Sequence, residues 1–491
     1  MLRWTAVVLE AFSRVMSRLP VSSSEYRKLS NRIVDLTAEY LQNIDKLPSF
    51  PHCSGQQTEQ LFGGSSPEDG LGEASLEAMP DVFANGRVTG PRFFGYVFGS
   101  GEPVAALADL AASVLNQNVT AWRSGPSAVA IERTVVGWLA DAIGCKGFTG
   151  SLTGGGSSAN LMALCMARER ALPGASRTGM PRDIRQPVIY TSAEAHMSMA
   201  KASAILGLGY DAIKLIPVDQ SFRMDVTALD HAIDTDMRAG KVPVAIVASA
   251  GTTATGSIDD MEAIAEIARR QNIWMHVDGA YGALAAMAVP EKFAGMGRAD
   301  SVSLDPHKWL YQPADCGCLL YRDSAMAQQV FAHSGDYAKS LISDPIEGFA
   351  FFEESMELSR RFRALKLWLS IRYHGMRAFR ESIGEDMRLA RHLATRIAQE
   401  HSLELLAPVA LSAVCFRFVD APAGTDLNAL NQQVLQTVID QRKVYISNAN
   451  IQGKFSLRAC IVNHRSTTSD VEAVVTETLA AARAIMARTA Q

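Results

Sequence analysis

The run Ser301-Val-Ser-Leu-Asp-Pro-His-Lys-Trp-Leu310 decides how this chain of 491 residues is interpreted. It predicts a short strand that leads into a turn carrying Lys308, between His307 and Trp309. Lysine is usually solvated at the surface, but apolar surroundings favour its neutral, nucleophilic amine. Such an amine forms Schiff bases with carbonyl compounds.

Two upstream segments indicate what the lysine would bind. Ile273-Trp-Met-His-Val-Asp-Gly-Ala-Tyr-Gly282 places Asp278 at the end of an apolar strand, where a buried carboxylate needs a partner. Thr153-Gly-Gly-Gly-Ser-Ser-Ala-Asn160 is a glycine turn that opens a helix, where a phosphate would meet unpaired N–H groups. Taken alone, Asp278 also suits a turn cap and the glycines a flexible turn. Together with Lys308 they predict a pyridoxal phosphate (PLP) site.

The bulk composition excludes several classes of protein. The length predicts two or three domains, and a net charge of −4 gives no sign of nucleic-acid binding. Seven scattered cysteines favour reduced thiols and a cytoplasmic protein. No metal site is expected, because Cys316 and Cys318 lack a second ligand pair and His276 with Asp278 lacks a third ligand.

The N-terminal part predicts helices and loops. Apolar residues in Met1–Leu19 recur at helical spacing, and charged residues interrupt them, so we expect an amphipathic helix that docks on a second subunit rather than a membrane span. A membrane-surface anchor is the weaker alternative. The glycine-rich stretch from Ser54 to Ser75 predicts a connecting loop.

From about residue 100 onward, short β-branched runs alternate with helical patterns. The predicted strands are Pro187–Tyr190, Val242–Ala248, Ile273–Val277 and Gly317–Tyr321, and Asp260–Gln271 is a predicted helix. Such alternation indicates an α/β fold with a mostly parallel sheet that binds ligands beyond its strand carboxyl ends. A second, α+β unit is expected after residue 375, with helices at Phe379–Glu400, Leu427–Arg442 and from Ser469, and strands at Ala413–Val419 and Phe455–Val462.

These segments, in this order and spacing, resemble the group II PLP-dependent amino acid decarboxylases of fold type I, the aspartate aminotransferase-like fold. The aromatic L-amino acid decarboxylase and glutamate decarboxylase branches are the most similar. The resemblance runs from about Pro91 to Cys460. It implies a helical dimerisation segment over 1–100, a large PLP-binding domain over 101–375 and a small domain over 376–491. It also implies a homodimer with shared active sites and an amino acid as small-molecule substrate.

The family pattern assigns roles to individual residues. Lys308 would form the Schiff base, Asp278 would pair with the pyridinium nitrogen, and His196 would stack on the ring. Tyr337 lies at the position of a loop tyrosine that returns a proton to the substrate; a surface loop residue is the alternative. The cofactor residues implied are Gly156, Ser157, His196, Thr253, Asp278, Ala280, His307 and Lys308.

The substrate wall departs from the aromatic-specific pattern. Those enzymes carry larger apolar residues at positions that here are Val88, Val97, Asn118 and Thr120. Arg123 would pair with a distal carboxylate or make a structural ion pair, whereas Arg458 would meet the substrate carboxylate. An aromatic substrate is therefore in doubt, although aromatic side chains remain available at Tyr96, Phe98 and Trp122.

Three functions follow, in order of preference. The first is decarboxylation of an L-amino acid to its amine and CO₂. The second is decarboxylation with oxidative deamination to an aldehyde, which a phenylalanine in place of Tyr337 would favour. The third is a catalytically inactive binding protein, against which the retained Lys308, Asp278 and His196 argue.

Overall fold

The computed structural model describes residues 19–181, 185–333 and 344–489. The chain divides into two units, residues 1–88 and residues 89–491. Apart from Leu19, the amphipathic helix predicted at the N-terminus lies outside the described residues. None of the described helices is long and apolar enough to cross a bilayer.

The first unit is helical. One helix lies within the stretch predicted as a loop, because the side chain of Ser54 accepts from the backbone N–H of Gln57 while the Gln57 side chain accepts from that of Ser54. This capping box satisfies N–H groups that the first turn of a helix leaves unpaired. The helices of this unit are α2 (Ser23–Asn43), α3 (Gly55–Phe62), η1 (Gly72–Ala78) and α4 (Met79–Asn85).

The second unit is built on a seven-stranded sheet of order β1-β7-β6-β5-β4-β2-β3. Only β7 runs antiparallel to its neighbours, which confirms the predicted mostly parallel α/β fold. The strands are β1 (Thr149–Thr153), β2 (Pro187–Ser192), β3 (Ile213–Ile216), β4 (Val242–Ser249), β5 (Trp274–Asp278), β6 (Ser301–Leu304) and β7 (Gly317–Tyr321).

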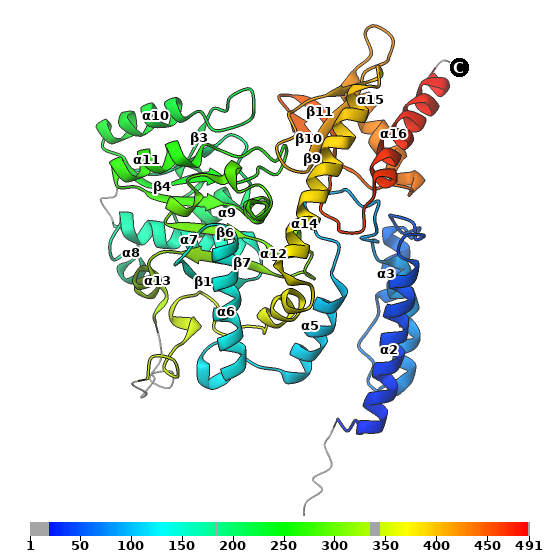
Figure 1. The fold of residues 1–491 in the computed structure, drawn as a ribbon, viewed down its shortest axis with the longest axis horizontal. Coiled ribbons are helices and arrows are strands. Elements are labelled where there is room, and N and C mark those ends of the chain that lie inside the picture. Colours follow the sequence, from blue (N-terminus) through cyan, green and yellow to red (C-terminus); the bar gives the residue numbers. More distant parts are fainter. Residues whose placement is uncertain (1–18, 182–184, 334–343, 490–491) are drawn as a thin grey trace, which may run out of the picture. The chain divides into compact units, whose positions relative to one another are not determined.

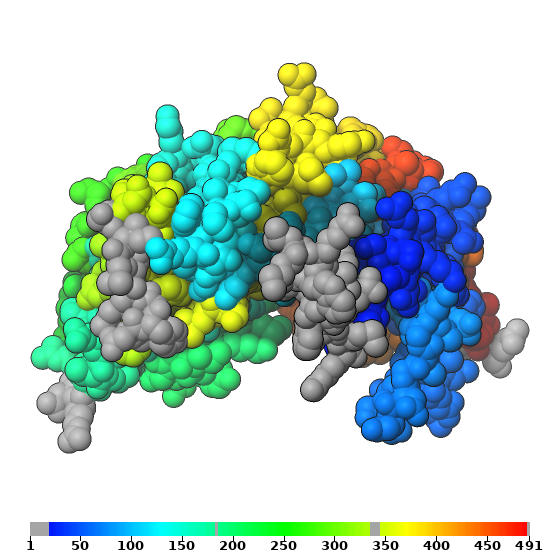
Figure 2. Space-filling model, turned by 90° about the horizontal axis from the view of Figure 1, so that it is seen from below, coloured from blue at the N-terminus to red at the C-terminus, as the bar shows by residue number. Residues whose placement is uncertain are grey.

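Helices cover both faces of this sheet (Figure 1). Alternate residues of β4 enter different cores: Ala245 and Val247 share a core with α7 and α9, whereas Ile246 and Ala248 share a core with α10 and α11. The helices of this part are α5 (Pro103–Leu115), α6 (Pro126–Ala142), α7 (Gly156–Ala171), α8 (Ala175–Thr178), α9 (Ser198–Ile205), α10 (Val226–Arg238), α11 (Met261–Gln271), α12 (Pro306–Trp309) and α13 (Ser324–Phe331). On the surface, α5 and α6 lie beside the start of α14 (Figure 2, cyan and yellow).

An antiparallel sheet of order β10-β11-β9-β8 lies in the C-terminal part. Its strands are β8 (Leu403–Leu405), β9 (Ala413–Phe418), β10 (Ser447–Ile451) and β11 (Lys454–Cys460). It shares a core with α15 (Leu427–Gln441), α16 (Thr468–Thr489) and the second half of α14 (Ala364–Ala398). The helix predicted from Phe379 is thus longer than expected: α14 continues upstream across a kink at Gly375, where φ is +79°.

Candidate active site

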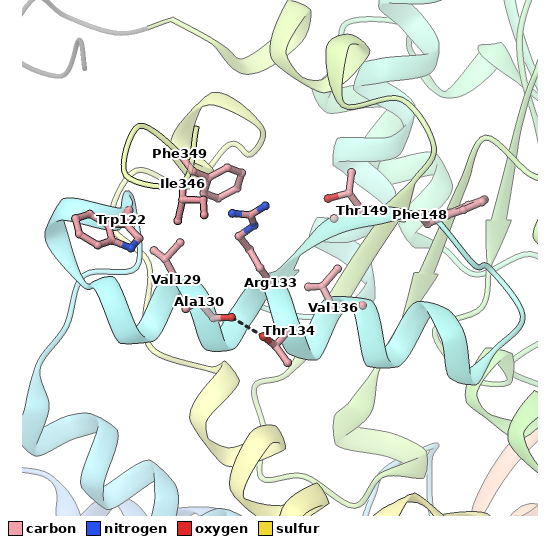
Figure 3. Close-up of a pocket in the computed structure, with 12 residues that line it drawn as sticks. Trp122, Val129, Ala130, Arg133, Thr134, Val136, Phe148, Thr149, Ile346 and Phe349 are labelled. Atoms are coloured by element: carbon pink, nitrogen blue, oxygen red, sulfur yellow. Dashed lines mark hydrogen bonds between the residues drawn. The ribbon is translucent and has the colours of Figure 1, made fainter. Parts of the chain in front are cut away.

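One hollow of the second unit holds none of the residues predicted to bind the cofactor. It lies along α6 and is lined largely by apolar side chains (Figure 3). The guanidinium of Arg133, its single ionisable group among the described residues, lies 4.7 Å from the ring centroid of Phe349. The described lining of this hollow offers no pair of groups for acid–base or covalent chemistry.

A second cavity lies at the carboxyl edge of the large sheet. β1, β2, β4, β5 and β6 all end at this edge, because they run in one direction. The cavity is lined by every residue predicted to bind the cofactor, namely Gly156, Ser157, His196, Thr253, Asp278, Ala280, His307 and Lys308. Tyr96, Val97 and Arg458 from the predicted substrate wall line it too.

The glycine turn follows directly on β1. The hydroxyl of Thr153 donates to the carbonyl of Gly155 at 3.1 Å and accepts from its N–H at 3.3 Å. Gly155 has φ +129°, a conformation that side chains disfavour. A Cβ on Gly156 would stand 2.7 Å from the Cβ of Ala280. Only glycine therefore fits at position 156 without a shift, and the bare backbone of this turn can offer its N–H groups to a phosphate.

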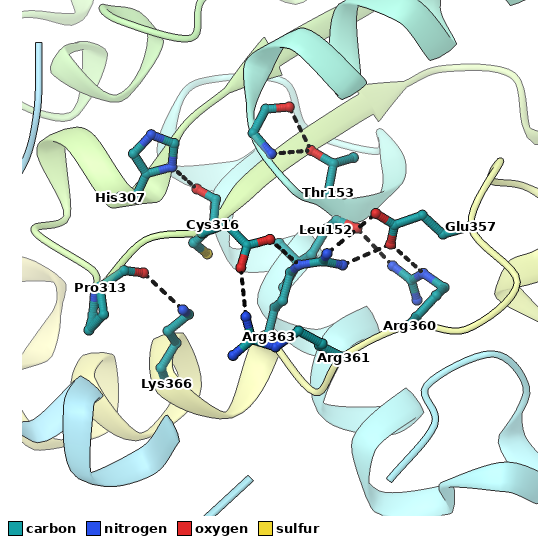
Figure 4. Close-up of polar contacts among 12 residues, drawn as sticks. Leu152, Thr153, His307, Pro313, Cys316, Glu357, Arg360, Arg361, Arg363 and Lys366 are labelled. Atoms are coloured by element: carbon teal, nitrogen blue, oxygen red, sulfur yellow. Dashed lines mark hydrogen bonds and ion pairs between the residues drawn. The ribbon is translucent and has the colours of Figure 1, made fainter. Parts of the chain in front are cut away.

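A group of ion pairs lies next to the glycine turn (Figure 4). The carboxylate of Asp315 would stand 3.3 Å from a Cβ on Gly154 and pairs with Arg361 at 2.9 Å and Arg363 at 3.0 Å. Burial raises the pKa of Asp315, but the arginine beside it outweighs burial and holds that pKa below its usual range. Arg363 also bonds Glu357 at 2.8 Å. The carboxylate of Asp315 thus presents no uncompensated charge to the turn.

Lys308 lies on the one-turn helix α12, which follows β6. Its Nζ stands 2.9 Å from Oδ2 of Asp305, and Oδ1 of that buried carboxylate has no partner among the described residues. The neighbouring His307 donates from Nδ1 to the carbonyl of Cys316 at 2.8 Å. Burial lowers the pKa of His307, so the ring is neutral near pH 7.

Asp278 ends β5 and receives three hydrogen bonds. Its Oδ1 accepts from the N–H of Ala280 at 3.2 Å and from the hydroxyl of Ser303 at 3.3 Å. Its Oδ2 accepts from Nδ2 of Asn160 at 3.2 Å. Asp278 therefore presents to the cavity a carboxylate held by three donors, the kind of group that would pair with a protonated ring nitrogen.

His196 lies in the turn between β2 and α9. Its Nδ1 is 2.9 Å from the hydroxyl of Ser198 and also accepts from the N–H of that residue at 3.3 Å. The ring faces the same cavity as Asp278. It is therefore held from one side, and its other edge is available to the cavity.

Arg458 comes from β11 of the second sheet and is 3% exposed. Its Nε donates to the carbonyl of Ala254 at 2.9 Å, and Nη1 donates to the carbonyl of Tyr96 at 3.1 Å. Its Nη2 has no partner within the described ranges. A buried cationic donor without a partner marks a place for an anion.

Several predicted residues do not meet in this cavity. Phe98 lies beside it, with its ring centroid 6.3 Å from that of His307. Asn118 accepts from the N–H of Arg360 at 2.9 Å, the carbonyl of Thr120 accepts from the N–H of Phe352 at 3.2 Å, and Arg123 is exposed on the short helix η2 (Trp122–Ser124). Val88 belongs to the first unit, and Tyr337 lies outside the described residues.

The cavity is also lined by residues that no motif of the sequence predicts. Asp305 falls inside the run around Lys308. Its i, i+3 spacing from the lysine could have indicated the ion pair between the two residues. Asn160 closes the glycine segment. Ser447 and Asn448 of β10 gave no local signal, because only the packing of the second sheet brings them here.

These residues fit PLP. The glycine turn offers N–H groups to a phosphate, Lys308 offers an amine, and Asp278 offers a carboxylate already held by donors. Arg458 lines the same cavity, and its Nη2, which has no partner among the residues that the structure describes, can pair with a second anionic group. The residues on the cavity wall thus match both the cofactor and a carboxylate-bearing ligand.

Comparison with known proteins agrees with this geometry. Residues 77–419 match the model of the pyridoxal-dependent decarboxylase conserved domain. The chain belongs to this family. It is a PLP-dependent carboxy-lyase of fold type I, with PLP as its cofactor.

Individual relatives cover nearly the whole chain. An aromatic-L-amino-acid decarboxylase of Bacillus atrophaeus is 32% identical over 92% of this chain and 94% of its own. A phenylacetaldehyde synthase of Petunia hybrida is 28% identical over 89% of this chain and 90% of its own. A solved structure of Oryza sativa TDC with PLP and tryptamine superposes with a TM-score of 0.89 at 26% identity, covering 96% of this chain and all of that one.

Proposed function

We propose that this enzyme decarboxylates an L-amino acid to the corresponding amine. The reaction takes up one proton at Cα and releases the α-carboxylate as CO₂. One observation carries the proposal: Lys308, Asp278 and His196 line the same cavity as Arg458, whose buried Nη2 has no partner in the described part of the chain. The cavity therefore offers a cofactor site and a carboxylate site side by side.

Each residue has a distinct proposed role. Lys308 attaches the cofactor covalently, and Asp278 pairs with its ring nitrogen. His196 lies against the ring face. Arg458 binds the substrate carboxylate through Nη2 and orients the bond that breaks. PLP, when bound, accepts the electron pair that this bond leaves behind. Tyr337 or His196 returns the proton to Cα.

An aromatic L-amino acid is the substrate class that the relatives favour. The Bacillus atrophaeus and Oryza sativa proteins support it, as does Tyr96 on the cavity wall. Tyr96 hydrogen-bonds through its hydroxyl to that of Tyr445 at 3.1 Å. The small Val97 beside it favours a different side chain. So do the polar Asn118 and Thr120, which do not line the cavity of their own chain but in the proposed homodimer would reach that of a partner. The substrate panel below therefore includes acidic and diamino acids.

Aldehyde formation is the second candidate, because the Petunia hybrida relative is a phenylacetaldehyde synthase. That outcome would consume O₂ and water and release CO₂, ammonia and hydrogen peroxide. The tyrosine at position 337 favours simple decarboxylation instead. Measuring peroxide beside CO₂ separates the two reactions, and one peroxide per CO₂ would establish the aldehyde route.

A homodimer with shared active sites is part of the proposal. Helix α5 exposes an apolar stripe formed by Leu107, Leu110 and Val114, which are 58%, 46% and 61% exposed. A second copy of the chain covering this stripe would bury it. The loop with Asn118, Thr120 and Arg123, which does not line its own cavity, would then reach the partner's cavity. The predicted domain roles and a cytoplasmic location belong to the same proposal.

The deciding experiment incubates the PLP-loaded enzyme with the common amino acids and diamino acids and measures CO₂ and amine. We expect release from one chemical class, and loss of turnover by at least about a thousandfold in Lys308→Ala, because covalent catalysis is lost. The exposed Lys292→Ala is the matched control and should keep full activity. Absence of CO₂ from every substrate, or normal turnover in Lys308→Ala, would refute the proposal.

A further inference from the structure

Asn160 lies in the first turns of α7, is 1% exposed and faces the active-site cavity. Its side chain makes hydrogen bonds to three named partners, with both N–H donors in use. Nδ2 donates to Oδ2 of Asp278 at 3.2 Å and to the hydroxyl of Ser198 at 3.1 Å. Oδ1 lies 2.9 Å from Nε2 of His276. One amide thus contacts three residues from two different elements, β5 and α9.

The donors in this network can be assigned without ambiguity. An ionised carboxylate only accepts, so Nδ2 must face Asp278 and Oδ1 must face His276. Oδ1 only accepts, so the proton of the His276 ring is on Nε2. Burial lowers the pKa of His276 to about 4, which leaves the ring neutral with a lone pair on Nδ1.

The side-chain contact between His276 and Ser301 agrees with that tautomer. The indole N–H of Trp274 can only donate, and it does so to the hydroxyl of Ser301 at 3.0 Å. The proton of that hydroxyl is then free to point at Nδ1 of His276, 2.9 Å away. A chain of donors therefore runs in one direction, from Trp274 through Ser301 and His276 to Asn160.

A branch leaves Asn160 toward the second ring-binding residue. The hydroxyl of Ser198 accepts from Asn160, so its own proton points at Nδ1 of His196. The N–H of Ser198 points at the same nitrogen. Nδ1 of His196 is therefore an acceptor, and the ring carries its proton on Nε2.

We propose that Asn160 is a positioning residue that holds the carboxylate of Asp278 and, through Ser198, the ring orientation and tautomer of His196. The assignment rests on the roles of Asp278 and His196 in the proposed function. The two residues that contact the cofactor ring at its nitrogen and at its face then share one support. Because each donor fixes the next, losing the amide disturbs both contacts at once.

Three variants separate the parts of this network. Asn160→Ala removes both branches, whereas Ser198→Ala removes only the branch to His196. Asn160→Asp keeps the shape but removes both N–H donors and puts a second carboxylate beside Asp278, and two such close carboxylates do not both ionise. The matched control is Asn431→Ala: Asn431 is also fully buried, but it bonds the backbone of Phe418 in the small sheet, away from the cavity.

The readouts are the dissociation constant of PLP, its absorption spectrum in the enzyme, and the ¹⁵N shifts of labelled histidines. In the wild-type protein we expect His196 and His276 protonated on Nε2. In Asn160→Ala we expect PLP binding to be weaker by about tenfold or more, because buried partners lose their hydrogen bonds. We also expect a shifted absorption spectrum and a mixture of tautomers at His196. The Ser198→Ala, Asn160→Ala double variant should be little worse than Asn160→Ala alone.

Asn431→Ala should leave all three readouts unchanged. Wild-type PLP affinity, spectrum and His196 tautomer in Asn160→Ala would overturn the proposal, even if the wild-type enzyme releases CO₂ as expected. If Asn160→Ala fails to fold, an unaltered His196 tautomer in Ser198→Ala together with an unaltered PLP spectrum in Asn160→Asp overturns it. A wild-type enzyme that releases no CO₂ would instead refute the proposed function and leave the network to be judged by the tautomers.

Discussion

Nζ of Lys308 stands 2.9 Å from Oδ2 of Asp305, and the same oxygen would stand 3.2 Å from a Cβ on Gly156. One buried carboxylate therefore touches both the lysine and the glycine turn. Its ion pair with Lys308 compensates its charge while the amine is free. A phosphate in the turn would bring a second negative charge close to it.

We expect Asp305→Asn to tighten PLP binding, by about tenfold, because it removes a like charge worth roughly 1–2 kcal/mol at such distances. The amide also offers an N–H donor in place of an acceptor. Titrating the apoenzyme with PLP and following the visible band measures the effect. Asp315→Asn is the control, since Arg361 and Arg363 already neutralise that carboxylate, and it should not tighten binding. Weaker binding in Asp305→Asn would contradict this account.

Gly156→Ala should weaken PLP binding by about tenfold or more. The new methyl group would stand 2.7 Å from the Cβ of Ala280, so the turn must move away from the cavity. Overpacking of this kind costs roughly 1–3 kcal/mol. Gly384→Ala, in α14 with nothing within 4 Å, is the control and should stabilise the protein by about 0.5–1 kcal/mol. Urea unfolding and PLP titration of both variants test the contrast.

The sequence could predict those residues of the site that lie at or just after the end of a strand. Asp278, His196 and Lys308 each follow an apolar run, and parallel strands bring their carboxyl ends to one edge. Across that edge the structure places Ser249, Asp278 and Ser303 in register on adjacent strands.

What escaped prediction depends on contacts between distant segments. Strand β10 is largely polar, and it joins β11 through Gln452 and Gly453, whose φ angles are +52° and +82°. Its turn lacks the usual Asn-Gly signal. The loop with Asn118 and Thr120 likewise gave no sign that it packs on its own chain near Arg360. The spacing of residues in the sequence indicates which side chains could belong to the site, but the packing of distant segments determines which of them lie in the cavity.

Arg458→Lys should impair substrate binding more than cofactor binding. Lysine keeps the charge but loses Nη2, the donor that has no partner among the described residues. We expect KM for the amino acid to rise by roughly tenfold to a hundredfold, since charged hydrogen bonds are worth about 1.5–3 kcal/mol. Inhibition by the amine product, which lacks the carboxylate, should change little. Equal losses for amine and amino acid would show that Arg458 has only a structural role. Arg417→Lys, which alters a structural ion pair with Glu404, is the control, and any loss it causes should be equal for the two ligands.

His276 should make the stability of the apoprotein depend on pH. Burial lowers its pKa from 6.5 to about 4, so between these values the unfolded chain binds a proton that the folded chain does not. Stability must then fall as the pH drops from 6.5 toward 4. For this one group the loss between pH 7 and pH 5 is on the order of 2 kcal/mol. In His276→Gln the unfolding free energy should be lower at pH 7, because the contacts with Ser301 and Asn160 are disturbed, but its fall toward pH 5 should be smaller by that amount.

The exposed His231→Gln is the matched control and should follow the wild-type slope. Buried Asp259, whose pKa burial raises to about 6, acts in the opposite direction in all three proteins and so cancels from the comparison. Parallel slopes for wild type and His276→Gln would mean that the ring is not held neutral, and the donor chain through Asn160 would lose its fixed direction.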